Sequence, residues 1–222
     1  MAIAWRPCLA ELIGTFALCF IGAGAICTDA MTGGGVGLLG IAIAHGLVLS
    51  IAVSATGHIS GGHINPAVTC AFFATGRIGG GKAVQYIVAQ LVGATIAGFA
   101  LRSIFAQDVW SKVNLGTPGL GAGVSQGTGI FIEAILTFLL VFAVFGTAVH
   151  PSAPKIGGFG IGLTIAFNII MAGPLTGASM NPARTFGPAL AAGFWDGHIV
   201  YWIGPLLGAL IAGLVYDKFL SK

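Results

Sequence analysis

The tripeptide Asn-Pro-Ala occurs twice in this sequence, as Asn65-Pro66-Ala67 and as Asn181-Pro182-Ala183. Each copy opens a short apolar segment, where proline suits the first helical position and asparagine suits the capping position before it. With its side-chain oxygen accepting backbone N–H groups, each asparagine keeps an NH₂ group free to donate into a cavity. Two such donors, backed by the positive ends of two short helices, would orient water oxygens and repel cations. One copy alone would indicate little more than a turn, whereas two matched copies form a specific pattern.

Glu11, Glu133 and Arg184 are charged residues inside otherwise apolar stretches, where a charge is costly and usually functional. Arg184 directly follows the second Asn-Pro-Ala motif, so we expect its guanidinium to face a cavity rather than lipid. Glu11 and Glu133 occupy matching places in the two halves of the chain. They could form a proton relay, or each could accept hydrogen bonds from the backbone of a re-entrant loop. Their matched placement favours the second role.

The composition indicates the surroundings in which these residues act. Charged residues make up 7% of the 222 residues and hydrophobic residues 56%, whereas a soluble domain carries roughly 25% charged residues. Because so few charges cannot solvate a globule of this size, we predict an integral membrane protein whose outer surface faces the lipid bilayer. The nine basic residues are scattered singly, which argues against a nucleic-acid partner, and the four cysteines follow no metal or redox spacing. We therefore expect no metal, no cofactor and no catalytic residues.

Six apolar stretches are long enough to cross a bilayer, which needs about 20 residues. They cover residues 8–27, 36–57, 82–105, 126–149, 158–173 and 198–219. Two shorter stretches, 66–75 and 182–192, begin close to the Asn-Pro-Ala motifs and reach about 15 Å, half of a hydrocarbon core of roughly 30 Å. The sequence therefore predicts an all-α membrane protein with six transmembrane helices and two re-entrant half-helices.

The two halves of the chain resemble each other. The thirteen residues 57–69 match residues 173–185 at a constant offset of 116, with six identities. Each half contains three spanning helices, an odd number, so the second half must lie upside down relative to the first. We expect a single membrane domain, 1–222, built from inverted repeats at about 1–115 and 120–222, with its functional site at the midplane where the broken segments meet.

Basic residues set the expected orientation, because cytoplasmic loops carry an excess of lysine and arginine. With the N-terminus in the cytoplasm, most of the basic residues near helix ends fall on that side: Arg6, Arg77, Lys82, Lys155, Lys218 and Lys222. Lys112 and Arg102 fall on the other side. We therefore expect both termini in the cytoplasm.

These motifs resemble those of the aquaporin, or major intrinsic protein, family, and the likeness runs from Glu11 to Lys218. The segment GPLTGASMNPARTFGPALAAG around the second motif is most similar to the plant tonoplast-type branch. The resemblance implies a right-handed bundle of six helices and two half-helices that forms one membrane channel domain per chain, and a homotetramer in the membrane. The short termini favour a prokaryotic member, and with it the cell (inner) membrane.

The resemblance also implies roles for individual residues. Its selectivity filter would comprise His45, Ile169, Ala178 and Arg184, at the family's spacings from the two motifs. Glu11 and Glu133 would support the two re-entrant loops. His63 would order the first loop close to the pore entrance.

A passive water channel that excludes protons and ions is the function that the resemblance favours. A glycerol-type facilitator is disfavoured because Thr185, Ala189 and the Tyr201-Trp202 pair depart from that subgroup's pattern. An ammonia-permeable channel stays open: His45 with Ile169 is the tonoplast-type combination, but residues 106–127 lack the histidine that ammonia channels of that branch carry. An ion-coupled secondary transporter would need a free midplane carboxylate, and an enzyme would need a nucleophile with its base. The sequence offers neither pattern.

Overall fold

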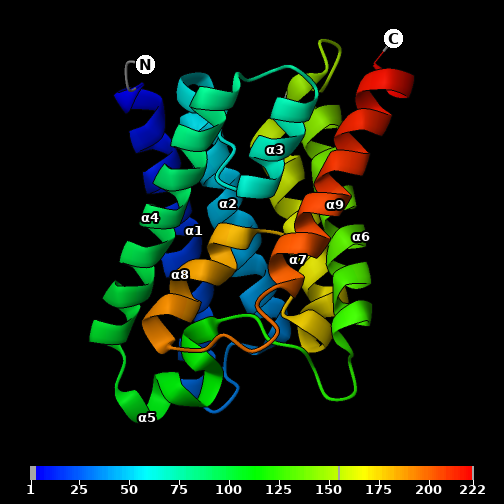
Figure 1. Cartoon of the computed structure of the whole chain (residues 1–222). Helices are drawn as coiled ribbons and strands as arrows, with labels where there is room; N and C mark the ends of the chain where they lie inside the picture. Colours follow the sequence, from blue (N-terminus) through cyan, green and yellow to red (C-terminus); the bar gives the residue numbers. More distant parts are fainter. Residues whose placement is uncertain (1–3, 155, 222) are drawn as a thin grey trace.

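The computed structural model describes residues 4–154 and 156–221, and every regular element within these ranges is a helix. In the described ranges, six helices are long and apolar enough to cross a membrane (Figure 1). They are α1 (Trp5–Met31), α2 (Gly37–Ser60), α4 (Gly80–Ile104), α6 (Gln126–Val144), α7 (Gly157–Thr176) and α9 (Val200–Val215). Short π-helical turns extend α6 through Phe145–Val149 and α9 through Tyr216–Leu220. The six predicted spans are confirmed, with small differences at their ends.

Two shorter helices, α3 (Pro66–Ala74) and α8 (Pro182–Ala192), reach only part of the way across the bundle. In Figure 1, α3 lies in the half of the bundle that carries both termini, and α8 lies nearer the opposite end. The loops that lead to these helices turn back into the bundle, where irregular backbone is tolerated because protein surrounds it. The predicted fold, all-α with six spans and two re-entrant half-helices, is confirmed.

Glycines at helix crossings bring the spans close together, as is usual where packing holds helices in lipid. At the crossing of α2 and α7, a Cβ on Gly46 would lie 2.6 Å from the carbonyl oxygen of Gly162. At the crossing of α6 and α9, a Cβ on Gly204 would lie 2.8 Å from the carbonyl oxygen of Ile130. Larger residues at these positions would force the helices apart, which explains part of the chain's high glycine content.

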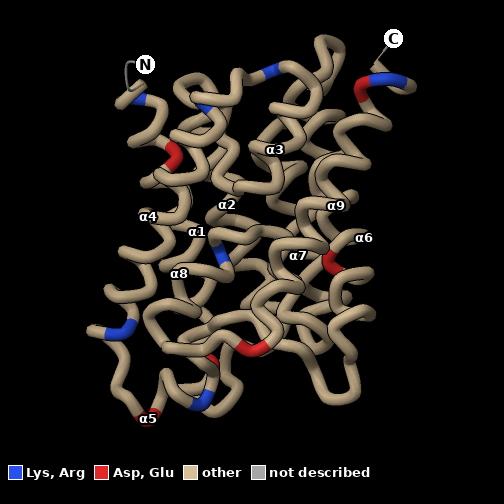
Figure 2. Tube along the Cα trace, in the orientation of Figure 1, with Lys and Arg blue, Asp and Glu red and all other residues tan. Residues whose placement is uncertain are grey.

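Most of the charged positions lie toward the two ends of the bundle (Figure 2). The helices between these ends expose many large apolar side chains. Side chains such as Phe131 and Phe167 are more than half exposed, as expected where lipid replaces water as the solvent. Among the basic residues that the structure describes, Arg184 is the exception, because it lies on α8 and is only 4% exposed. Two residues in the orientation argument, Lys155 and Lys222, lie outside the described residues.

The connection between α4 and α6 contains two short helices that the sequence analysis did not predict, α5 (Gln107–Trp110) and η1 (Ser111–Gly116). They lie at the end of the bundle opposite the termini (Figure 1). The end of η1 is packed tightly against α1, because a Cβ on Gly116 would lie 2.8 Å from the Cα of Ala23. This connection therefore brings backbone from residues 111–116 into the bundle, close to α8.

Candidate functional site

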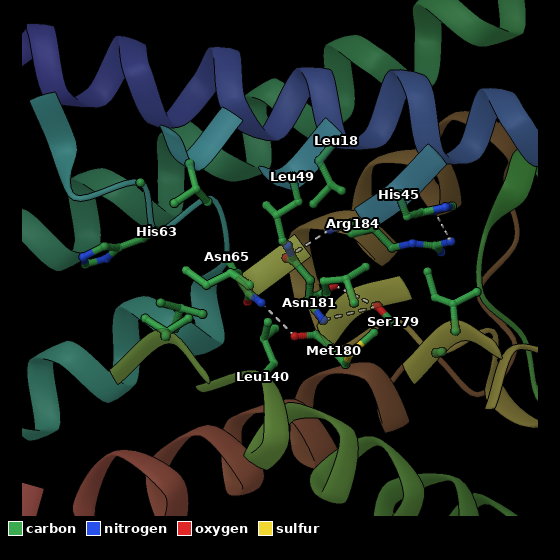
Figure 3. Close-up of a pocket in the computed structure, with 18 residues that line it drawn as sticks. Leu18, His45, Leu49, His63, Asn65, Leu140, Ser179, Met180, Asn181 and Arg184 are labelled. Atoms are coloured by element: carbon green, nitrogen blue, oxygen red, sulfur yellow. Dashed lines mark hydrogen bonds between the residues drawn. The ribbon is translucent and has the colours of Figure 1, made fainter. Parts of the chain in front are cut away.

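A narrow cavity with a volume of about 20 Å³ lies where the N-terminal ends of α3 and α8 meet (Figure 3). Its polar lining comes from α2, α8 and the two re-entrant loops: His45, His63, Asn65, Ser179, Asn181 and Arg184. Its apolar wall comes from five helices: Leu18, Leu49, Val53, Val68, Leu140, Val144, Ile161, Ile165 and Ile169. The cavity therefore has a mostly apolar wall with a few polar groups, which is the usual design of a selective site.

Asn65 and Asn181 cap the two half-helices from an extended backbone conformation. In each case Oδ1 accepts from the backbone N–H two residues further on, at 2.8 Å for Asn65 and at 3.0 Å for Asn181. Asn181 Oδ1 also accepts from the backbone N–H of Arg184 at 3.2 Å. The residues that follow each cap form the buried first turn of its half-helix: Pro66, Ala67, Pro182 and Ala183.

The side-chain NH₂ groups of the two asparagines join the two loops reciprocally. Asn65 Nδ2 donates to the carbonyl oxygen of Met180 at 2.8 Å, and Asn181 Nδ2 donates to that of Ile64 at 2.9 Å. This corrects the expectation that both NH₂ groups are wholly free. Each amide has two N–H donors, so one joins the opposite loop and the second is left for the cavity.

His45 and Arg184 contact each other at the cavity (Figure 3), with Arg184 Nη2 3.0 Å from His45 Nε2. The other ring nitrogen, Nδ1, lies 2.8 Å from the carbonyl oxygen of Ile41. Because a carbonyl can only accept, Nδ1 carries the hydrogen, and Nε2 of the neutral ring accepts from Arg184. Arg184 Nη1 also donates to the carbonyl oxygen of Gly116 at 3.3 Å. The guanidinium is thus held from two sides, and its remaining N–H groups can face the cavity.

Ile169 and Ala178 line the same cavity as His45 and Arg184 and are nearly fully buried, at 3% and 1% exposure. Ile169 comes from α7 and Ala178 from the loop before α8. The structure therefore brings together all four residues of the predicted filter from four separate segments. Two of them present polar groups and two present only hydrocarbon.

Glu11 and Glu133 each accept hydrogen bonds from one re-entrant loop. Glu11 accepts from the Ser60 hydroxyl at 2.6 Å and from the backbone N–H groups of residues 63 and 64 at 2.9 and 2.5 Å. Glu133 accepts from the Thr176 hydroxyl at 2.7 Å and from the backbone N–H groups of residues 179 and 180 at 2.9 and 2.7 Å. Neither glutamate is among the described residues that line the cavity. These contacts support the loop-supporting role over a proton relay.

His63 lies at the end of the cavity nearer the termini. Its side chain lines both the central cavity and a wider vestibule that opens between Arg77, Lys82 and His150. The ring is 4.2 Å from Phe72, centroid to centroid, and Nδ1 lies 3.1 Å from the hydroxyl of Thr69. The ring is therefore held at the junction between the cavity and the vestibule. No group of three or more possible metal ligands occurs among the described residues.

Sequence reasoning missed several residues that hold the site. Gln90 Nε2 donates to Glu11 at 2.8 Å and to Thr69 at 3.1 Å, and Tyr86 donates to the carbonyl oxygen of Ser60 at 2.8 Å. In the second half, Tyr201 donates to the carbonyl oxygen of Thr176 at 2.8 Å. The two tyrosines are 115 residues apart. This separation is close to the offset between the two repeats, so the repeat could have predicted the pair of tyrosines. No such pattern points to Gly116 or Gln90.

The fold and the cavity together define a membrane channel protein in which two half-helices meet inside six spanning helices. A family model described as "Major intrinsic protein" matches residues 1–216. The chain therefore belongs to the major intrinsic protein family, and the resemblance stated from the sequence is confirmed. Membership in a family of channels also means that the chain is not an enzyme.

Individual relatives agree with the family assignment. Aquaporin TIP4-4 of Zea mays is 50% identical over 220 residues, which cover 96% of this chain and 85% of that protein. Aquaporin TIP2-1 of Arabidopsis thaliana is 43% identical over 221 residues, with 96% and 86% covered. Among solved structures, the aquaglyceroporin from Plasmodium falciparum has a TM-score of 0.86 over 98% of this chain and 97% of that chain. Because the sequence identity is only 23%, this similarity concerns the fold alone.

Proposed function

We propose that this chain is a passive water channel that excludes protons and ions. The observation that carries the proposal is the placement of Asn65 and Asn181 on one cavity, each with one amide N–H left after the bonds between the loops. A water molecule between them would accept from both amides. The apolar wall offers water few other partners, so water would cross without being held tightly.

Proton exclusion follows from the same two amides. A water molecule whose two lone pairs are both engaged cannot accept a proton from its neighbour, so the hydrogen-bonded chain of water is interrupted there. The N-terminal ends of α3 and α8 and the charge of Arg184 add a positive barrier to cations. Passage of water without passage of charge is the result.

The selectivity filter in this proposal comprises His45, Ile169, Ala178 and Arg184. Arg184 supplies the donors, and Ile169 and Ala178 supply apolar walls. Because Ile169 cannot form hydrogen bonds, the filter is less polar than one with a second histidine. Ammonia is for this reason the second candidate solute, and small neutral solutes larger than ammonia are disfavoured.

An ion-coupled transporter is a weaker alternative. Such a mechanism needs a carboxylate or ion site free at the midplane. Both buried glutamates are occupied by hydrogen bonds from the loops, as described above. The relatives named above as aquaporins also support a channel.

We further propose that the chain is one channel domain of two inverted repeats, about 1–115 and 120–222. The pairing of equivalent contacts supports this: Tyr86 with the Ser60 carbonyl matches Tyr201 with the Thr176 carbonyl. Assembly as a homotetramer is part of the same proposal and rests on the family resemblance. Native mass spectrometry of the detergent-solubilised protein tests it, and a monomer that conducts water would contradict it.

The proposed location is the cell (inner) membrane, with both termini in the cytoplasm. Arg6 and Lys82 lie in the first turns of α1 and α4, Arg77 lies between α3 and α4, and Lys218 lies in the turn after α9. These segments are at the end of the bundle that carries the termini (Figure 1), which supports this orientation. Fusion of a reporter that is active on only one side of the membrane to either terminus tests it. Reporter activity on the external side would contradict the orientation.

Stopped-flow light scattering on proteoliposomes tests the function. Under a sucrose gradient, vesicles that contain the protein should shrink much faster than empty vesicles, and under a glycerol gradient the two should re-swell at similar rates. An ammonium gradient measures the second candidate solute. Water flux that saturates or depends on a proton gradient would favour a transporter, and fast glycerol entry would favour a facilitator.

A further inference from the structure

Gly22 of α1 lies directly against the ring of His45. A Cβ atom built on Gly22 would lie 2.9 Å from His45 Cε1 and closer still to Cδ2 and Nε2. Real Cβ atoms essentially never come so close to other atoms, so no side chain fits here while the His45 ring keeps its place. The contact is made by the ring edge that carries Nε2, the atom that accepts from Arg184.

Both nitrogens of the His45 ring are already engaged in hydrogen bonds. Nδ1 is tied to the Ile41 carbonyl at 2.8 Å, and Nε2 is tied to Arg184 at 3.0 Å. His45 is 2% exposed, and its free face borders the narrow cavity. A group added on the α1 side could be accommodated only if the ring left at least one of these two hydrogen bonds.

The position of Gly22 on α1 connects this contact to the cavity. Leu18 lies four residues earlier, on the same face of the helix, and it lines the cavity together with His45. Helix α1 therefore presents one side chain that forms the cavity wall and, one turn later, a gap that receives the His45 ring.

We propose that Gly22 is a positioning residue of the selectivity filter, which acts by leaving the space that sets the orientation of His45 toward Arg184. The inference rests on the proposed function and adds a residue outside the cavity lining to the filter's determinants. Addition of a methyl group at Gly22 pushes the ring away from α1 and into the bore. A narrower bore then lowers water flux.

Water flux through proteoliposomes containing Gly22→Ala tests the proposal. Gly24→Ala is the matched control, because it adds the same methyl group to the same helix, where the new Cβ would lie 3.3 Å from the flexible end of Leu101. We expect flux per folded protein to fall about fivefold or more in Gly22→Ala and to change less than about twofold in Gly24→Ala, as a pore discriminates by its diameter. Circular dichroism and thermal unfolding establish that each variant is folded.

A double-mutant cycle separates action through His45 from a general packing defect. In a His45→Ala background the ring is gone, so the further change Gly22→Ala should alter flux by less than about twofold, a clear departure from additivity. If Gly22→Ala alone does not fold, recovery of a folded protein in the double variant supports the same contact. A loss of flux or of folding that persists in the His45→Ala background would overturn the inference.

The wild-type measurement separates failure of the proposed function from failure of the role of Gly22. If wild-type vesicles conduct water no faster than empty vesicles, the proposed function fails and this inference fails with it. If wild-type vesicles conduct water and Gly22→Ala vesicles conduct it equally fast, only the role of Gly22 fails.

Discussion

Asn65 and Asn181 each hold the loop that carries the other. Asn65 donates to the carbonyl of Met180, the residue before Asn181, and Asn181 donates to the carbonyl of Ile64, the residue before Asn65. Those two residues, Ile64 and Met180, have φ of 54° and 55°, in the left-handed region that residues with a side chain rarely adopt. The unusual backbone turns their carbonyls toward the opposite asparagine, at a cost of the order of 1 kcal/mol each. The distance between the two capping asparagines is thereby set by the backbones of both loops.

Proton exclusion is the first consequence. We predict water flux through wild-type proteoliposomes with no measurable proton flux, because a water held by Asn65 and Asn181 has both lone pairs engaged. A pH-sensitive dye trapped inside the vesicles, together with an imposed pH gradient, measures the proton flux. Acidification faster than the lipid background, in vesicles that also conduct water, would show that the chain of water is not interrupted.

Removal of a loop-supporting carboxylate should destabilise the protein. In Glu133→Ala, the hydroxyl of Thr176 and two backbone N–H groups lose their buried acceptor, which we expect to cost about 3 kcal/mol or more of unfolding free energy. Glu133→Gln retains one acceptor oxygen and should lose less. Thermal unfolding in detergent ranks the variants, with Asp108→Ala as an exposed acidic control. Equal melting temperatures for Glu133→Ala and the wild type would mean that the carboxylate does not support the loop.

Inhibition of water flux by mercury should distinguish a cysteine that lines the cavity from cysteines that do not. All four cysteines, Cys8, Cys19, Cys27 and Cys70, belong to the described part of the chain, and the cavity lining includes none of them. Ala178 does line it, so Ala178→Cys would place a thiol in the bore. We expect weak inhibition of wild-type water flux by mercury and strong inhibition of the Ala178→Cys protein. Complete inhibition of the wild type at low mercury concentration would show that the filter is misplaced or that Cys70 controls the bore.

Substitution of Ile169 tests the polarity of the filter. Ile169→His should narrow the bore and add a polar contact, so ammonia flux, where present in the wild type, should fall by a larger factor than water flux. Parallel sucrose and ammonium gradients on the same vesicles give the ratio of the two fluxes. An unchanged ratio would remove Ile169 from the filter.

Substitution of Arg184 should act in the opposite direction. Arg184→Val removes the charge and the donors that face the cavity, so larger solutes or cations should gain access relative to water. The water-to-glycerol flux ratio and a cation-sensitive dye measure this change. The variant would also remove the 3.0 Å hydrogen bond from Arg184 to His45 Nε2, so a folding control by circular dichroism accompanies the measurement.

Much of this architecture could be predicted from the sequence, because its causes are local or repeated. Lengths of apolar segments predicted the spans, and Asn-Pro-Ala predicted the start of each half-helix to within a residue. Because a charge inside an apolar segment is costly, the sequence alone predicts that Arg184 faces a cavity. Family resemblance was needed for Ile169 and Ala178, because an isoleucine and an alanine in an apolar chain have no distinguishing chemistry.

Other features depend on contacts between distant segments and could not be predicted in this way. The bonds from Asn65 to Met180 and from Asn181 to Ile64 need two left-handed residues whose backbone conformation no motif indicates. The carbonyl of Gly116 reaches Arg184 only because the connection after α4 folds back into the bundle.

The osmotic water permeability of wild-type proteoliposomes, measured at several temperatures against empty vesicles, tests the central claim most directly. Because water molecules in this cavity would keep hydrogen bonds to one another and to its few polar groups, and need not dissolve in lipid, we predict a permeability well above that of empty vesicles, with a much weaker temperature dependence. Permeability and temperature dependence equal to those of empty vesicles, with the protein folded and inserted, would contradict the account.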